Sequence, residues 1–215
     1  KKINADKKIR FFKTHNAMCA INGNSFTDKF NTCGVIYIVR DPRNIITSIS
    51  NHYEIANDKS LEFISNKRKI IFPIKKGTVN DSNENDFNFL SDWGTHYLSW
   101  KNISFCPIKI IKYEDLVNNT RKNFLSILDF LSKFIKIEYD DKKIINAIKT
   151  TSFEKLSGLE QKKGFDESII SKKTNKKIKF FNLGKQNNWK NLLKKKIISK
   201  TEKIFQDQMK ELGYL

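Results

Sequence analysis

The stretch that decides the fold is VIYIVRDPRNIITSISNHY, residues 35–53. Its first five residues are a continuous hydrophobic run, typical of a strand covered on both faces, as in parallel sheets. Asp41 can cap a helix, and Pro42 can occupy its first position. Residues at helical spacing predict one buried stripe, made of Ile45, Ile46, Ile49 and Tyr53. The stretch therefore predicts a strand, a turn and a helix, the repeating unit of α/β domains.

Two further strands are predicted at residues 9–14 and 108–112. Each is followed by helical periodicity or a polar loop, which is the alternation expected of a parallel sheet. The predicted fold class is therefore α/β, with a three-layer parallel sheet flanked by helices.

Helices account for most of the remaining chain. One is predicted to resume at Phe89, and another spans residues 116–134. The last predicted helix ends at Gly213 and buries one side, formed by Leu192, Leu193, Ile197, Ile204, Phe205 and Leu212. Residues 75–88 are polar, lack periodicity and predict a surface loop or lid.

The composition excludes disorder throughout, because 39% of the 215 residues are hydrophobic and 12% are aromatic. A net charge of +18 favours a polyanionic ligand. Lysines greatly outnumber arginines and are spread along the chain, which is typical of a solvated surface. Nucleic-acid binding is therefore kept only as an alternative function.

The sequence predicts a cytoplasmic protein. No apolar run approaches the ~20 residues of a membrane span, and KKINADKK at the start lacks the apolar stretch of a signal peptide. Three cysteines without a CxxC pair fit a reducing compartment, and no metal site is expected. Because the chain opens with Lys1 and a predicted strand follows within nine residues, we expect an N-terminal piece to be missing.

Lys13 and His15, in the motif KTH, end the first predicted strand. Because side chains alternate along a strand, both are expected on one face at its carboxyl end, where open α/β sheets bind ligands. A histidine there can accept a proton near neutral pH, and the adjacent ammonium can neutralise developing charge. The alternative is a surface lysine beside a hydrogen-bonded histidine that closes the strand.

Arg40 and Ser48 form a second candidate pair. Arg40 directly follows the strand at residues 35–39, and Ser48 lies about two turns into the next helix, whose N-terminus is electropositive. An arginine fork and a hydroxyl that converge there suit a cluster of phosphate oxygens. The alternative is an arginine paired with Asp41 or Glu114.

Two weaker signals lie in the second half of the chain. Tyr113 and the stretch from Thr151 to Phe153 offer flat rings and small hydroxyls that can hold a purine, although Phe153 also suits a core position. In FFNLGKQNNWKN, Gly184 permits close backbone approach, and Lys185 and Lys190 can meet phosphate. The alternative for that stretch is a loop before the last helix.

No nucleotide-binding loop of the GxxxxGK[ST] type is written in this sequence. GLEQKKG at residues 158–164 has the wrong spacing, and no GxGxxG follows a predicted strand. A complete ATP-binding P-loop enzyme is therefore excluded.

In their order, the motifs resemble sulfotransferases of the cytosolic and bacterial type, which use 3′-phosphoadenosine 5′-phosphosulfate (PAPS). The resemblance covers nearly the whole chain. It rests on RFFKTHNA at 10–17, VIYIVRDPRNIITSISNHY at 35–53, SDWGTHYLSW at 91–100, KYEDL at 112–116, TTSFEKLSGLEQKKGF at 150–165, FFNLGKQNNWKN at 180–191 and the terminal MKELGYL.

The resemblance implies a single sulfotransferase-like domain over residues 1–215, with a fold related to P-loop nucleotide kinases. It implies that His15 is the general base and that Lys13 assists in handling charge. It further implies a donor site for PAPS, whose product is adenosine 3′,5′-diphosphate. The residues implied for that site are Arg40 and Ser48 at the 3′-phosphate, Tyr113, Thr151 and Phe153 at the adenine, and Gly184 beside the 3′-phosphate.

This sequence departs from the family pattern at two places. The family's PKSGTTW-like loop for the 5′-phosphosulfate should precede KTH by several dozen residues, yet only twelve residues precede Lys13. The basic residues common before the glycine of the FFRKG-like motif are here Asn182 and Leu183, and Lys185 is the candidate to replace them. This chain is therefore expected to be weakly active by itself.

The resemblance implies transfer of a sulfuryl group from PAPS to a hydroxyl or amine of a small-molecule or glycan acceptor, with no metal. The first alternative is a catalytically silent nucleotide-binding module of the same fold. The second is a basic nucleic-acid-binding protein, for which the sequence carries no recognised motif.

Overall fold

Two parallel strands form the centre of the fold, β3 (Val35–Val39) and β6 (Ile108–Lys112). They pair in register from Val35 opposite Ile108 to Val39 opposite Lys112, so their carboxyl ends meet at one edge. This computed structural model describes residues 8–72, 87–171 and 173–215, apart from the side chain of Lys185. Two short antiparallel pairs are added, β1 (Ala20–Ile21) with β2 (Asn24–Ser25) and β4 (Ile70–Ile71) with β5 (Asn88–Phe89).

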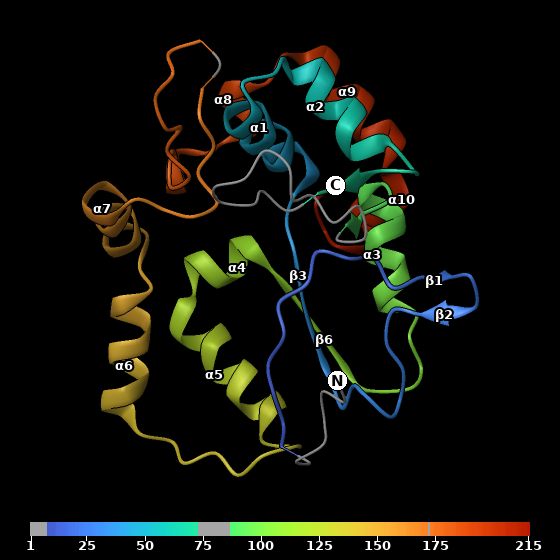
Figure 1. Cartoon of the computed structure of the whole chain (residues 1–215), viewed down its shortest axis with the longest axis vertical. Coiled ribbons are helices and arrows are strands. Elements are labelled where there is room, and N and C mark those ends of the chain that lie inside the picture. The colour runs from blue at the N-terminus through green and yellow to red at the C-terminus, as the bar shows by residue number, and fades with distance from the viewer. Residues whose placement is uncertain (1–7, 73–86, 172) are drawn as a thin grey trace, which may run out of the picture.

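Helices cover both sides of the central pair. In Figure 1, α4 and α5 lie on one side of β3 and β6, and α3 and α10 lie on the other. The α-helices are α1 (Pro42–Tyr53), α2 (Asn57–Ser65), α3 (Trp93–Lys101), α4 (Tyr113–Asn118), α5 (Thr120–Leu131), α6 (Asp141–Thr150), α7 (Phe153–Lys163), α8 (Trp189–Leu192), α9 (Lys195–Ile204) and α10 (Gln206–Glu211), with a 3₁₀ turn, η1 (Gly184–Gln186), before α8.

The start of α1 is fixed by the residues that predict it. The Asp41 carboxylate accepts a hydrogen bond from Arg43 N at 2.9 Å, and Pro42 occupies the first turn. Ile46 is fully buried, whereas Tyr53, at the end of the predicted stripe, is partly exposed. The helix therefore leaves the tip of β3 in one defined direction.

The main core packs around the carboxyl end of β3. Its buried members come from β3, α1, α2, α3, α9, α10 and the residues that end α8 and α9, namely Val39, Ile46, Leu61, Ile64, Trp93, Tyr97, Leu193, Ile197, Phe205 and Met209. The rings of Trp93 and Phe205 meet edge to face, with 5.2 Å between their centroids. Because the core sits directly behind the strand tip, it holds the first turns of α1 in place.

The prediction of a strand at residues 9–14 is wrong. The segment forms no β-ladder, and Phe11 and Phe12, which a strand would turn to opposite faces, are each 68% exposed. A strand needs a neighbour for its backbone hydrogen bonds, and no described strand pairs with these residues. The central sheet therefore has two parallel strands, not three, in the described part of the chain.

The predicted boundaries of two middle helices need correction. The helix expected to resume at Phe89 begins at Trp93, because Phe89 is in β5 and Asp92 caps α3 by accepting from Thr95 N at 2.9 Å. The helix expected over residues 116–134 starts earlier, with α4, breaks at Asn119 and ends with α5.

The last predicted helix is divided into α8, α9 and α10. The backbone leaves helical geometry at Leu193 and again at Phe205, so the buried side shifts from one helix to the next. Leu192 and Ile204, predicted on the buried side, are 41% and 50% exposed. The breaks allow Phe205 and Met209 to be buried together.

Of the loop predicted at residues 75–88, residues 75–86 lie outside the described part of the chain, and Asn88 begins β5. Within the described ranges, no helix combines the length and apolar character that crossing a membrane requires.

Candidate functional site at the strand tips

Arg40 and Ser48 lie in contact at the carboxyl end of β3. Arg40 Nη1 donates to Ser48 Oγ at 3.1 Å. The contact forms because Arg40 directly follows β3 and Ser48 lies on the side of α1 that faces the strand tip. Among the described residues Arg40 forms no ion pair with Asp41 or Glu114, since Glu114 Oε1 instead accepts from Asp41 N at 3.1 Å. The two side chains therefore converge as the sequence predicts.

The Arg40 guanidinium has one buried donor without an acceptor among the described residues. Its Cζ lies 4.4 Å from the centre of the Tyr113 ring, and the Arg40 carbonyl accepts from Trp93 Nε1 at 3.2 Å. Nε is buried and has no hydrogen-bond partner among the described residues. A buried donor without an acceptor costs on the order of 1–3 kcal/mol, and more when charged. This orphaned N–H group fits an anionic ligand such as phosphate.

Asn187 is a third member of this cluster, and the sequence did not point to it. Its Nδ2 donates to Ser48 Oγ at 2.9 Å, and its Oδ1 accepts from Thr47 Oγ1 at 2.5 Å. The residue follows η1, far along the chain from α1. The only sequence signal is its place in FFNLGKQNNWKN, the stretch that contains the candidate residues Gly184 and Lys185.

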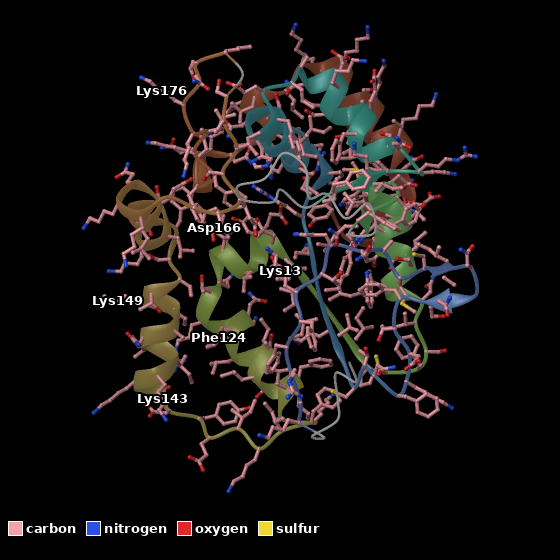
Figure 2. All side chains as sticks on the ribbon, in the orientation of Figure 1. Lys13, Phe124, Lys143, Lys149, Asp166 and Lys176 are labelled. Atoms are coloured by element: carbon pink, nitrogen blue, oxygen red, sulfur yellow. The ribbon has the colours of Figure 1, made fainter. Side chains whose placement is uncertain are left out.

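His15 and Lys13 are close, but not through strand alternation, since no strand forms there. Lys13 Nζ pairs with Glu167 Oε1 at 3.1 Å, and both side chains are exposed. Figure 2 shows Lys13 and Asp166, the residue before Glu167, near one another beside α4. Although the His15 ring reaches solvent, nearby protein atoms displace part of its water and lower its pKa, with a further lowering from Lys13 and an opposing effect of Glu167.

His96 anchors the backbone beside His15. Its Nε2 lies 3.2 Å from the carbonyl oxygen of His15, and its Nδ1 lies 2.8 Å from the hydroxyl of Tyr37. Since a carbonyl can only accept, Nε2 carries the hydrogen and Nδ1 accepts from Tyr37. Burial lowers the pKa of His96, in keeping with this neutral form. His96 therefore joins α3 and β3 to the segment that presents His15.

Phe153 packs directly on Gly184. A Cβ atom on Gly184 would lie 2.8 Å from the Phe153 ring, and the backbone φ of Gly184 is +52°, so steric overlap and strain both disfavour a side chain there. Thr151 is exposed, and its Oγ1 donates to the Ala147 carbonyl at 2.8 Å at the end of α6. The side chain of Lys185 lies outside the described part of the chain.

A cavity of about 230 Å³ opens beside Arg40, between β3, α1, α2 and α3. Its lining is mostly apolar, with Ser91, Asp92, His96 and Arg40 as the polar members. Among the described residues no group of three or more histidine, cysteine or acidic side chains is placed to hold a metal ion. Exposed lysines are spread over the outer surface, as Lys143, Lys149 and Lys176 show in Figure 2.

The sequence profile of the sulfotransferase domain matches residues 1–213. Among solved structures, the fold is similar to that of mouse sulfotransferase SULT7A1 complexed with PAP, with a TM-score of 0.51 and 22% sequence identity. The match covers 84% of this chain and 59% of the mouse chain. No curated protein sequence matches this chain.

Proposed function

This chain belongs to the sulfotransferase domain family, and we propose that it transfers a sulfuryl group from PAPS to a hydroxyl or amine of a small-molecule or glycan acceptor. The observation that carries the proposal is the Arg40–Ser48 contact beside a buried N–H group of Arg40 that has no partner in the described chain. A guanidinium and a hydroxyl that converge at a strand tip, with one guanidinium N–H left without an acceptor, suit the oxygens of a 3′-phosphate.

The other proposed contacts with the sulfuryl donor PAPS are assigned by the resemblance and supported by packing. The Tyr113 ring already stacks with the Arg40 guanidinium, so an adenine near it would lie close to the phosphate-binding pair. Phe153, held against Gly184, offers a second ring for the purine. Thr151 is proposed at the adenine edge, and Lys185 is proposed to supply charge that Asn182 and Leu183 do not.

The proposed chemical step needs one base and one cation. The acceptor oxygen or nitrogen attacks sulfur, the S–O bond to the donor phosphate breaks, and His15 takes the acceptor proton. A lowered pKa keeps His15 neutral near pH 7, which is the form a base requires. Lys13 is proposed to neutralise charge on the departing oxygen, and for this its Nζ must exchange Glu167 for the transferred group.

A nucleotide-binding module without transfer activity is the second candidate. It is favoured by one observation, the Lys13–Glu167 ion pair, because a lysine held by a carboxylate is not free to assist the reaction. Binding and transfer must therefore be measured separately.

Calorimetry with adenosine 3′,5′-diphosphate tests the binding site in the full-length protein. Arg40→Ala should weaken binding by about 1.5–3 kcal/mol, because it removes a charge-assisted contact. The affinity for adenosine 5′-monophosphate, which lacks the 3′-phosphate, should fall much less in the same variant. Arg121→Ala, which breaks an exposed ion pair with Asp141, is the matched control and should change neither value. Unchanged affinity in the Arg40 variant would sink the assignment.

Single-turnover transfer tests the base. His15→Ala should slow sulfuryl transfer ~10²-fold or more while donor affinity stays nearly constant. His52→Ala is the matched control, because burial also lowers the pKa of His52 near the end of α1. Transfer that survives His15→Ala but fails in His52→Ala means that the base is wrongly chosen. A wild-type protein that binds the nucleotide and transfers nothing supports the second candidate.

A further inference from the structure

The side-chain amide of Asn187 is fixed in one orientation. Its Nδ2 lies 3.3 Å from the main-chain carbonyl of Asn44, which can only accept a hydrogen bond. The atom facing that carbonyl must therefore be the nitrogen, and the amide oxygen then faces the Thr47 hydroxyl at 2.5 Å. The same nitrogen directs its second hydrogen to Ser48 Oγ at 2.9 Å.

Ser48 Oγ consequently receives two donors, Asn187 Nδ2 and, at 3.1 Å, Arg40 Nη1. A hydroxyl oxygen has two lone pairs and one hydrogen. Neither donor can accept that hydrogen, because an amide NH₂ and a guanidinium have only N–H groups to offer. The hydroxyl hydrogen of Ser48 must therefore point toward a different acceptor.

The usual hydrogen-bond acceptor for the hydroxyl of a helical serine is already occupied. Such a hydroxyl normally donates to a carbonyl three or four residues back, as Ser65 does to Leu61 at 2.7 Å. For Ser48 the carbonyl four residues back is that of Asn44, which already accepts from Asn187 Nδ2 at 3.3 Å and lies 2.8 Å from Thr47 Oγ1. In the described part of the chain, no oxygen accepts from Ser48 Oγ.

We propose that Asn187 is a positioning residue that turns the Ser48 hydroxyl hydrogen toward the 3′-phosphate of the donor nucleotide. The inference rests on the function proposed above. A phosphate offers only acceptors, so a serine that presents its hydrogen strengthens binding, whereas one that presents a lone pair opposes it. Asn187 and Arg40 together fix the first arrangement before the ligand arrives.

The test compares affinities of the full-length protein for adenosine 3′,5′-diphosphate and adenosine 5′-monophosphate by calorimetry. Asn187→Ala should weaken binding of the diphosphate roughly tenfold and leave the monophosphate nearly unchanged, since one hydrogen bond to a charged group is affected. Asn187→Asp should weaken diphosphate binding further, because a carboxylate captures the Ser48 hydrogen and adds negative charge.

Asn188→Asp is the matched control for charge. Asn188 is exposed, caps α8 through Lys190 N at 3.0 Å, and aspartate caps equally well, so this variant adds the same charge without facing Ser48. It should weaken diphosphate binding clearly less than Asn187→Asp does. In a Ser48→Ala background, Asn187→Ala should have no additional effect.

Provided that Arg40→Ala still weakens binding, any one of three results would overturn this inference without affecting the proposed function. These are an equal loss for both nucleotides, an Asn187→Asp variant no weaker than Asn188→Asp, or a full Asn187→Ala effect that persists without the Ser48 hydroxyl. A wild-type protein that shows no preference for the 3′-phosphate would instead remove the proposed function and this inference with it.

Discussion

Replacement of Arg43 by alanine should destabilise the protein by about 3–5 kcal/mol, the usual cost of removing one partner from a buried ion pair. The Arg43 side chain is 5% exposed. Its guanidinium binds the Asp41 carboxylate at 2.7 Å, Glu202 at 2.5 Å and the Tyr214 carbonyl at 2.9 Å. Its flat face also lies 3.8 Å from the centre of the Trp189 ring. The substitution leaves Asp41 buried without its cation.

Arg121→Ala provides the matched control. Arg121 makes a similar contact, 2.8 Å to Asp141, but its side chain is 55% exposed and that of Asp141 is 75% exposed. Solvent screening limits such a pair to about 1 kcal/mol or less. Both arginines lose the same atoms, so the difference between the two variants isolates burial.

Urea unfolding measures both variants. Folded domains have only about 5–15 kcal/mol of stability, so Arg43→Ala should lower the urea midpoint by roughly 1 M or more, and Arg121→Ala should move it little. If Arg43→Ala does not fold at all, Arg43→Lys, which keeps a charge but loses the planar fork, should give an intermediate midpoint. Equal losses for Arg43→Ala and Arg121→Ala would refute the reasoning.

Two further predictions concern single contacts. Lys13→Met should raise the pKa of His15 and Glu167→Gln should lower it, because the first removes a positive and the second a negative neighbour. NMR titration of the imidazole checks both signs, and shifts in the same direction would contradict the electrostatic account. Gly184→Ala should destabilise the protein by about 1–2 kcal/mol because of left-handed backbone strain. Overlap of the new methyl group with the Phe153 ring should add to this loss. Gly158→Ala, in α7 with open space around it, should stabilise by up to about 1 kcal/mol, and thermal unfolding that shows equal signs for the two glycines would contradict this reading.

The unit from β3 to α1 could be predicted in detail because its determinants are local. Five hydrophobic residues, a capping aspartate and a proline all lie within residues 35–42, and the eight-residue step from Arg40 to Ser48 brings both to one strand tip. Hydrophobic period and cap chemistry act within a few residues, so no long-range information is needed.

The segment at residues 9–14 shows where local reasoning fails. Its composition suits a strand, but a strand forms only if another strand offers its edge, and that depends on the whole topology. The Lys13–Glu167 ion pair and the Asn187–Ser48 hydrogen bond could not be predicted from the sequence for a related reason. Their partners are 154 and 139 residues apart, and nothing in either local sequence specifies the other.

The buried Arg43 cluster and the proposed phosphate site share one piece of structure, the first two turns of α1. Arg43 packs on the Trp189 ring, and Asn44 Oδ1 accepts from Trp189 N at 3.0 Å, so the segment just after η1 is held at its far end. Asn187, two residues before Trp189, is then confined to the space over Ser48. An exposed loop could not keep an amide at hydrogen-bond distance from one hydroxyl, because ordering it would cost too much entropy. The contacts of Arg43 and Asn44 with Trp189 hold this segment against α1, so that Asn187 is already ordered over Ser48.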